Sequence, residues 1–276
     1  MAIITISRGT HSGGKSVGES LASKLGYPCL SREEIIREAS IDFDIPEEEL
    51  NATMAEPPRF WQQVPSKRIA HMNFLRTTLV KHFENGNLVY HGYAAHLLLG
   101  KSIKVLRVRI NADKEYRIMG AMKDLNISRR EAIKGIDRVD RQNAKWARAL
   151  YGIDWNDPSL YDLVVNLQQI SMESIVETLA FMTTLDDFII DEQAMKAIDD
   201  LSLSSKVRSA LSKNPRTTSA KLFVDAEDGE ITLEGQVSSG KILNAILEET
   251  KSQPGVSSIK HDIKIGIIEY SLSPWQ

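Results

Sequence analysis

The stretch of sequence that decides the fold is ITISRGTHSGGKSVGESLASKLG, residues 4–26. The β-branched and short side chains around its start predict a buried strand over residues 2–7. Residues 9–14 have the glycine and serine content of a turn. Apolar side chains then recur at helical spacing until Gly26, where we expect the helix to end. A strand, a glycine-rich loop and a helix in this order predict the start of an α/β fold.

The loop between this strand and helix matches a phosphate-binding pattern in full. Residues 9–16, GTHSGGKS, satisfy G-x-x-x-x-G-K-[ST]. Glycines let consecutive backbone N–H groups point at phosphate oxygens, and the N-terminus of the helix adds a positive end. Lys15 would bring a positive charge to the β- and γ-phosphates, and Ser16 a hydroxyl ligand for Mg²⁺.

The sequence therefore predicts ATP, or another nucleoside triphosphate, as a ligand that binds with Mg²⁺. The alternative is a chance match in a turn rich in glycine and serine. The residues predicted to bind this cofactor are Gly9, Thr10, His11, Ser12, Gly13, Gly14, Lys15, Ser16 and Val17, with Ser16 as the metal ligand.

The remainder of the first 188 residues alternates strands with helices, which predicts a mostly parallel sheet of five strands with helices on both faces. The further strands are expected over residues 27–30, 88–90, 104–110 and 163–166. The further helices are expected over residues 32–39, 46–53, 66–84, 114–123, 128–149 and 171–185. The apolar positions of the helix at 66–84 are typical of a core helix or of a homodimer face.

A second, smaller α+β unit follows a polar stretch. Residues 189–202 are predicted to be a linker, and residues 203–270 to form the unit, with the element order αββαβ. Its strands are expected over residues 219–225, 230–237 and 257–267, and its helices over residues 203–212 and 240–252. Asp228-Gly229 between the first two strands predicts a hairpin turn.

Composition excludes several classes of protein. The 34 Lys and Arg against 37 Asp and Glu give a net charge of −3, which argues against specific nucleic-acid binding. The single cysteine, Cys29, excludes an internal disulfide framework. Because the start of the chain has no basic leader and no apolar segment of a signal peptide, we expect a cytoplasmic location.

The predicted helix at 128–149 carries basic residues of one sign along one stripe, roughly 80° wide. A solvated helix face is the alternative to a phosphate-binding role. We favour a lid that closes over the nucleotide, because positioned cations stabilise phosphoryl transfer. The stripe consists of Arg130, Lys134, Arg138, Arg141, Lys145 and Arg148.

With these features in place, the first 185 residues resemble nucleoside monophosphate kinases of the cytidylate kinase type, specifically the divergent cytidylate kinase-like group. The resemblance rests on the loop segment and on two further segments, VLRVRINADKEYRI and IDRVDRQNAKWARALYGIDWNDPSLYDLVVN. It implies a P-loop fold with a five-stranded parallel sheet, a helical lid that bears arginines, and Mg-ATP-dependent phosphoryl transfer to a small acceptor such as a nucleoside monophosphate.

The resemblance also implies roles for individual residues. Arg37 falls where the family has an acceptor-phosphate arginine, and Arg117 follows the fourth strand in a matching place. Asp137, Arg138, Asp140 and Arg141 fall in the D/R-rich stretch of the lid. With Lys15, Arg138 and Arg141 are the predicted catalytic residues, while Arg37, Arg117, Asp137 and Tyr93 are predicted to bind the substrate.

The chain departs from the family after its third strand. The family's Asp-Gly-Arg-Asp is replaced here by His91, Gly92, Tyr93 and Ala94, and its Asp-Thr-Gly after the second strand by Ser31, Arg32 and Glu33. A tyrosine cannot replace the charge of the lost arginine. The sequence therefore supports the binding of ATP better than it supports CMP as the phosphoryl acceptor. A nucleotide-binding sensor without efficient turnover is the alternative function.

Residues 201–270 resemble a BON domain, on the segments LSSKVRSALSKNP, LFVDAEDGEITLEGQV and PGVSSIKHDIKI. The resemblance implies a small binding module whose partner is a lipid, another ligand or a protein. Beside a cytoplasmic kinase, we expect it to have a regulatory or docking role.

Overall fold

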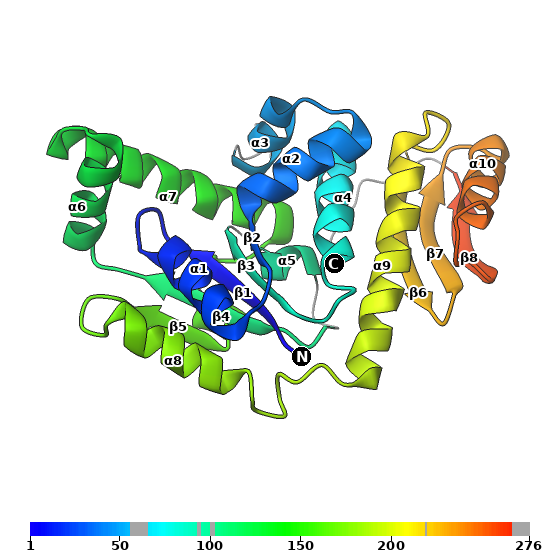
Figure 1. Cartoon of the computed structure of the whole chain (residues 1–276). Helices are drawn as coiled ribbons and strands as arrows, with labels where there is room; N and C mark the ends of the chain where they lie inside the picture. Colours follow the sequence, from blue (N-terminus) through cyan, green and yellow to red (C-terminus); the bar gives the residue numbers. More distant parts are fainter. Residues whose placement is uncertain (56–65, 93–94, 100–102, 219, 267–276) are drawn as a thin grey trace.

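The structure is a computed structural model of the whole chain, and it describes residues 1–55, 66–92, 95–99, 103–218 and 220–266. Two sheets organise these residues (Figure 1). The first unit contains β1 (Ile3–Arg8), α1 (Gly14–Leu25), β2 (Cys29–Ser31), α2 (Arg32–Phe43), α3 (Glu47–Ala55), α4 (Ser66–Lys81), β3 (Leu88–Gly92), α5 (Ala95–Leu99), β4 (Leu106–Asn111), α6 (Lys114–Leu125), α7 (Arg129–Tyr151), a 3₁₀ turn (Pro158–Leu160), β5 (Leu163–Asn166) and α8 (Met172–Met182).

The first sheet confirms the predicted α/β fold. Its five strands are all parallel, in the order β2-β3-β1-β4-β5. β1 lies in the centre, and Ile3, Ile4 and Ile6 are fully buried because helices cover both faces. One core contains Ile4, Ile6 and residues of α1 and α8, whereas the core on the other face contains Ile3 and residues of α2 and α4. The loop after β1 therefore emerges where the chain order reverses, which is the usual ligand position in such sheets.

Helices α6 and α7 form an arm beside this sheet. Their contact is a small apolar cluster that contains Ile118, Ala121, Ala132 and Ile136. α7 begins at a capping box, in which the hydroxyl of Ser128 accepts the N–H of Glu131. The contact between α6 and α7 therefore buries few side chains, whereas Trp146, Ala147 and Leu150 near the C-terminal end of α7 belong to a core of the first unit. The arm carries the lid residues predicted from the sequence.

The second unit is a mixed three-stranded sheet with two helices. β6 (Lys221–Glu227) and β7 (Glu230–Val237) are antiparallel, and Asp228 and Gly229 make the tight turn between them with positive φ angles. β8 (Ser258–Ile265) lies parallel to β7. Helices α9 (Glu192–Lys213) and α10 (Gly240–Lys251) contribute Val207, Leu211 and Ile246 to its core, so the predicted αββαβ order is observed.

Residues 192–202 of the linker predicted over residues 189–202 are helical and form the first half of α9. Ile190, just before α9, and Ala194 and Ile198 of this helix belong to a core of the first unit. Val207 and Leu211 of the helix belong to the core of the second unit. The first half of this helix contains many polar residues, so its sequence looks like that of a linker. The unit boundaries at residues 188 and 203 stay predictions.

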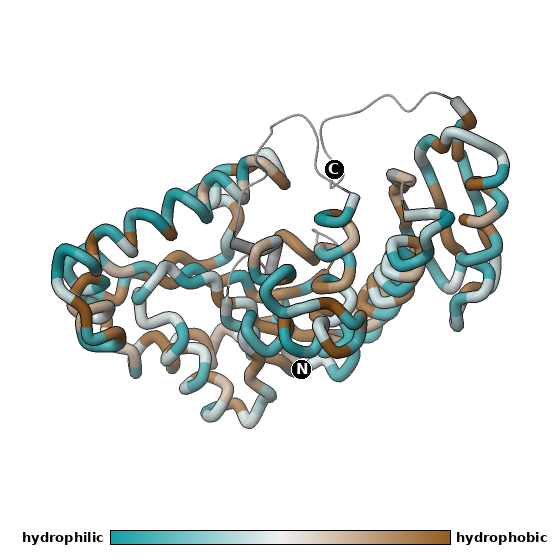
Figure 2. Tube along the Cα trace, turned by 90° about the horizontal axis from the view of Figure 1, so that it is seen from above, coloured by the Kyte–Doolittle hydropathy of each residue, from teal (hydrophilic) through white to brown (hydrophobic). Residues whose placement is uncertain are grey.

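α9 packs along α4, and two views place it between the sheets (Figures 1 and 2). The amide of Asn73 donates to the hydroxyl of Ser212 at 2.9 Å, and the hydroxyls of Thr77 and Ser209 lie 2.7 Å apart. The hydroxyl of Ser202 donates to the carboxylate of Glu84 at 2.7 Å. Hydrogen bonds along the whole contact therefore fix the register of the two helices.

Replacing Ile198 by Ala should lower the free energy of unfolding by about 2–5 kcal/mol, since it leaves a cavity in a core of the first unit. Urea denaturation measures the change. Lys213→Ala, at an exposed position of the same helix, is the matched control and should stay within about 0.5 kcal/mol of the wild type. Equal stability of the two variants would contradict the packing of α9 in that core.

Candidate functional site

The loop after β1 is held open by backbone geometry and by its attachment to β4. The N–H of Gly9 and the hydroxyl of Ser12 both donate to the carbonyl oxygen of Ile110, at 3.1 and 3.0 Å. Gly13 has a φ of 83°, which favours glycine. A Cβ on Gly14 would lie 2.5 Å from the Cβ of Arg8, so a side chain is excluded there. The loop thus needs the glycines that the sequence motif supplies.

The N-terminus of α1 is open toward solvent. Gly13 occupies the N-cap position, and among the described residues no side chain caps the helix there. The amides of Gly14, Lys15 and Ser16 lie in the first turn, where an α-helix provides no internal acceptor. The side chain of Lys15 is 62% exposed and only 3.7 Å from Glu19, so it is held by a weak surface pair. Amides and ammonium together offer donors to an anion.

These groups border a cleft with a volume of about 1120 Å³. On one side the cleft is bounded by the ends of β1 and β3 and the start of α2, and on the other by α6 and α7. Its lining contains residues 8–16 without a break, together with Glu19, Arg32, Glu33, Gly92, Tyr116, Met119, Gly120, Lys123, Asp124, Val139 and Asn143.

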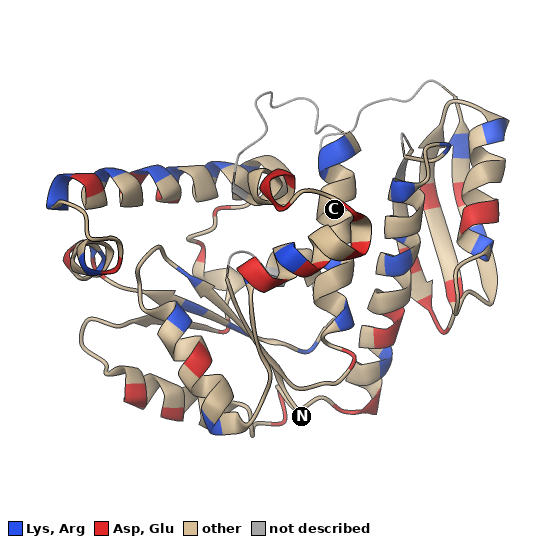
Figure 3. Cartoon of the chain, turned by 45° about the horizontal axis from the view of Figure 1, so that its top comes forward, with Lys and Arg blue, Asp and Glu red and all other residues tan. Residues whose placement is uncertain are grey.

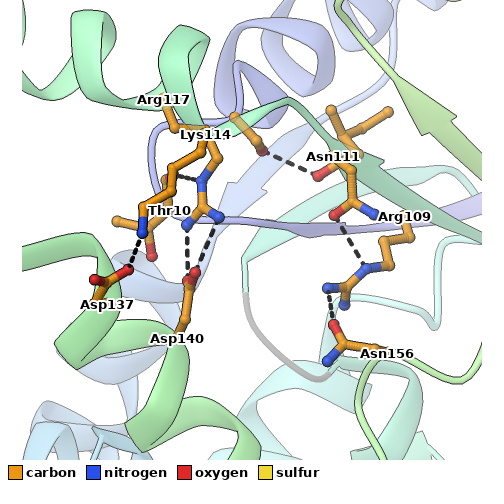
Figure 4. Close-up of polar contacts among 10 residues, drawn as sticks. Thr10, Arg109, Asn111, Lys114, Arg117, Asp137, Asp140 and Asn156 are labelled. Carbon is orange, nitrogen blue, oxygen red and sulfur yellow. Dashed lines mark hydrogen bonds and ion pairs between the residues drawn. The ribbon is translucent and has the colours of Figure 1, made fainter. Parts of the chain in front are cut away.

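Arg117 ties the α6–α7 arm to the loop, as Figure 4 shows. Its Nε donates to the carbonyl oxygen of Thr10 at 2.7 Å, and its two terminal nitrogens donate to the carboxylate of Asp140 at 2.9 and 2.7 Å. A bidentate pair of this kind fixes orientation as well as distance. Asp137 pairs with Lys114 at 2.9 Å. Neither Arg117 nor Asp137 belongs to the described lining of the cleft.

His11 makes a second contact between the loop and α6. Its Nδ1 lies 3.1 Å from a carboxylate oxygen of Asp124, and its backbone has a φ of 54°, which is uncommon for a residue other than glycine. A Cβ on Gly120 would lie 3.5 Å from the carbonyl oxygen of His11, so the helix backbone packs close to the loop. In this conformation the arm therefore rests on the phosphate loop.

The two predicted catalytic arginines of the lid do not face the cleft in this conformation. Arg138 and Arg141 are exposed and absent from its described lining, whereas Val139 and Asn143 of the same helix line it. At 100° per residue the centre of the cationic stripe lies roughly opposite those two residues. Figure 3 shows basic residues recurring along α7. All six residues of the stripe are exposed.

The three predicted substrate-binding residues that the structure describes, Arg37, Arg117 and Asp137, do not line the cleft. Arg37 is exposed on α2 and does not belong to the described lining of the cleft. Tyr93 lies outside the described residues. Of the predicted loop residues, Gly9 through Ser16 all line the cleft, and Val17 is fully buried in the core below it.

Sequence reasoning missed Arg8 and Tyr116 as cleft residues, and it treated Arg32 and Glu33 only as departures from a motif. A usable signal was present. Arg8 ends β1, and Arg32 and Glu33 directly follow β2. Side chains at the carboxyl ends of parallel strands gather at the ligand-binding edge of the sheet.

The described residues fit a nucleoside triphosphate that is bound with a metal ion. The loop supplies amides and one ammonium group, and Ser16 supplies an oxygen at the start of α1. Across the described ranges, no three His, Cys, Asp or Glu side chains gather as metal ligands. Mg²⁺ requires only one or two protein oxygens when phosphates provide others. Ser16 offers a hydroxyl oxygen here, and Glu19, Glu33 and Asp124 are carboxylates in the same lining.

His91 lies near the end of β3. It is 3% exposed, and its ring lies against Gly18 of α1, where an added Cβ would come within 3.0 Å of it. Burial, followed by the positive charge of Arg8, lowers the pKa of His91. The imidazole is therefore neutral at pH 7.

Comparison with known proteins agrees with this geometry. Residues 3–169 match the family model described as cytidylate kinase-like, and residues 199–266 match that of the BON domain, so both resemblances are confirmed. The cytidylate kinase of Ignicoccus hospitalis is 27% identical over 184 residues, which cover 66% of this chain and 99% of that protein. The cytidylate kinase of Sulfurisphaera tokodaii is 29% identical over 173 residues, 63% of this chain and 90% of that protein.

A solved structure supports the fold alone. An uncharacterized protein from Eubacterium ventriosum matches with a TM-score of 0.51 at 19% identity, covering 67% of this chain and 99% of that one. None of the helices in the described part of the chain combines the length and the apolar character that a membrane crossing demands.

Acidification should destabilise the chain through His91. Because its pKa is lowered in the folded state, the unfolded chain binds more protons below about pH 6.5, and stability falls as the pH falls from there. Urea denaturation at pH 7.5 and 5.5 measures the loss for the wild type and for His91→Gln. The variant should lose less stability between the two pH values. An equal loss in both proteins would contradict the assignment.

Proposed function

Because the chain belongs to the cytidylate kinase-like family, we propose that it transfers a phosphoryl group from ATP to a small anionic acceptor, with a nucleoside monophosphate as the first candidate. The observation that supports this most is the open N-terminus of α1 beside the exposed Lys15, in a cleft large enough for a nucleotide. The curated relatives carry the name cytidylate kinase, so CMP is the first acceptor to test.

In the proposed reaction an oxygen of the acceptor attacks the γ-phosphorus of ATP. The bond from that phosphorus to the oxygen bridging the β- and γ-phosphates breaks, and ADP leaves with the electron pair. Mg²⁺ neutralises phosphate charge when it is bound with the nucleotide. The amides of residues 13–16 and the ammonium of Lys15 hold the β- and γ-phosphates, and Ser16 contributes the hydroxyl ligand of the metal.

The lid role of Arg138 and Arg141 is part of the proposal, and it requires a movement. Both side chains point away from the described lining of the cleft, so α7 must turn or shift before they reach a transferring phosphoryl group. The contacts of Arg117 with Thr10 and Asp140 are the ones such a movement would break or remodel. Lids of this kind exclude water when they close.

On the acceptor side, the chain departs from the family pattern at residues 31–33 and 91–94. The proposal keeps Arg37, Arg117, Asp137 and Tyr93 as substrate-binding candidates on the resemblance alone.

The proposal also places the reaction in the cytoplasm, where ATP and Mg²⁺ are available. A lipid, another ligand or a protein is the partner class for the BON-like unit, and a homodimer is a candidate assembly.

The nucleotide site is tested with Lys15→Met. This variant should weaken the binding of Mg-ATP about ten- to a hundred-fold and reduce turnover, because it removes one charge-assisted contact with the phosphates. Calorimetry measures the affinity, and a coupled assay of ADP release across nucleoside monophosphates measures turnover. Lys24→Met, at the other end of α1, is the matched control and should bind ATP as the wild type does.

A second candidate function is a nucleotide sensor that acts through the BON-like unit. It is favoured by α9, a single helix whose residues enter the cores of both units and which is hydrogen-bonded to α4. A rigid element shared by two units can carry a conformational change from one to the other.

Hydrogen exchange of the full chain separates the two candidates. A sensor should change the protection of α9 and of β6 to β8 when Mg-ADP binds, because both units share this helix. A kinase without such coupling should change protection only around the loop, α6 and α7. Turnover with an acceptor, together with unchanged exchange in the BON-like unit, would exclude the sensor function.

A further inference from the structure

One end of the cleft holds a carboxylate between two guanidinium groups. Oε2 of Glu33 lies 3.4 Å from Nη2 of Arg8, and its Oε1 lies 3.4 Å from Nη2 of Arg32. All three residues belong to the lining of the cleft, together with Lys15 and the backbone of Gly92. This trio therefore shares one space with the phosphate loop.

The three side chains stand on the ends of regular elements. Arg8 is the last residue of β1, and Arg32 and Glu33 begin α2 directly after β2. A Cβ on Gly92 would lie 2.8 Å from the Cβ of Arg32, so the end of β3 packs against the base of that side chain. A capping box at Ser31 and Glu34 fixes the start of α2. The trio is held by the sheet, and its position does not depend on the α6–α7 arm.

The bonding of this trio is incomplete. Charge-assisted hydrogen bonds are usually about 2.7–2.9 Å long, and both contacts of Glu33 are longer. The Nε of Arg8 is buried and has no hydrogen-bond partner among the described residues. Two positive charges face one negative charge, which leaves a net charge of +1. The trio can therefore take up a further anion without a new basic residue.

Two other arginines expected at the acceptor are placed differently. Arg37 is exposed and outside the described lining of the cleft. Arg117 already donates to the carbonyl of Thr10 and to both oxygens of Asp140. Of these four arginines, only Arg8 and Arg32 line the described cleft.

We propose that Arg8 and Arg32 bind the anionic group of the phosphoryl acceptor, and that Glu33 is the internal counter-ion that holds them until the acceptor arrives. This inference rests on the proposed function, because it assigns the second substrate of the same cleft. The acceptor class is a small molecule with a phosphate group, whose oxygens match two guanidinium groups. Glu33 competes with that phosphate for the same two guanidinium groups.

Binding of CMP to the full chain, in the presence of a non-hydrolysable ATP analogue and Mg²⁺, tests the assignment by calorimetry. Arg32→Gln and Arg8→Gln should each weaken CMP binding about tenfold or more, since each loses a charged contact. Glu33→Gln should bind CMP several-fold more tightly, because the competing carboxylate is gone. If the three residues had only a structural role, all three substitutions would weaken CMP binding.

The controls separate this inference from folding and from the proposed function. Arg216→Gln, in an exposed pair with Glu248 of the other unit, should bind CMP as the wild type does. Arg32→Gln should keep the affinity for the ATP analogue within about threefold. It is the decisive variant, because Arg8 packs against Gly14 of the loop and Glu33 is one of the carboxylates that line the cleft beside the proposed metal ligand Ser16.

The outcomes are distinct. Loss of CMP binding in Arg37→Gln with normal binding in Arg32→Gln would overturn the inference and leave the proposed function standing. CMP binding that depends on Arg32, without turnover, would support the inference and overturn the proposed function. If CMP fails to bind the wild type, inorganic phosphate is the probe, and phosphate binding that is equal in wild type and Arg32→Gln would overturn the inference.

Discussion

The carbonyl oxygen of Ile110 accepts hydrogen bonds from the N–H of Gly9 and the hydroxyl of Ser12, and the cleft depends on this attachment of the loop to β4. It fixes the path of the chain between β1 and α1, and it leaves the first amides of α1 without an acceptor. Gly14 makes the same path possible, since any side chain there would meet Arg8. The candidate site is thus a consequence of how the central strand, its neighbour and the first helix are joined.

The other parts of the cleft differ in how well buried contacts hold them in place around that loop. Arg32 and Glu33 stand on the sheet and on a capped helix, so their positions are set by the core. α6 and the N-terminal half of α7 share only a small apolar cluster and contact the loop through Arg117 and His11, whereas Trp146 and Leu150 fix the C-terminal end of α7 in a core. An element with few buried contacts is the part of a structure that moves most readily. The arm, rather than the sheet, is where closure over a nucleotide would take place.

Local sequence pattern was enough to predict β1, the loop, α1 and the parallel sheet, because β-branched runs, glycines and helical periodicity act over short distances. It could not show which way the stripe of α7 faces. Periodicity places Arg138 and Arg141 on one side of a helix, but only tertiary packing of Ile136 and Trp146 decides that this side points to solvent. The ion pairs of Glu33 with Arg8 and of Arg117 with Asp140 join residues far apart in sequence, which no local pattern reports.

α9 gives the clearest case of tertiary context overriding local composition. Its first half looks like a polar connection because serine and aspartate are frequent. Ala194 and Ile198, with Ile190 just before the helix, nevertheless pack into a core of the first unit. Serines on its other side meet Asn73 and Thr77 of α4 by hydrogen bonds. The two units are therefore joined by a helix with a defined register and not by a flexible tether.

The most direct test of the central claim is to follow the backbone amide signals of Gly14, Lys15 and Ser16 by NMR while Mg-ADP is added to the labelled full chain. If phosphates bind at the N-terminus of α1, these three signals should shift the most, and signals of α8 and α10 should stay in place. Nucleotide binding that leaves the three amides unperturbed would contradict the account.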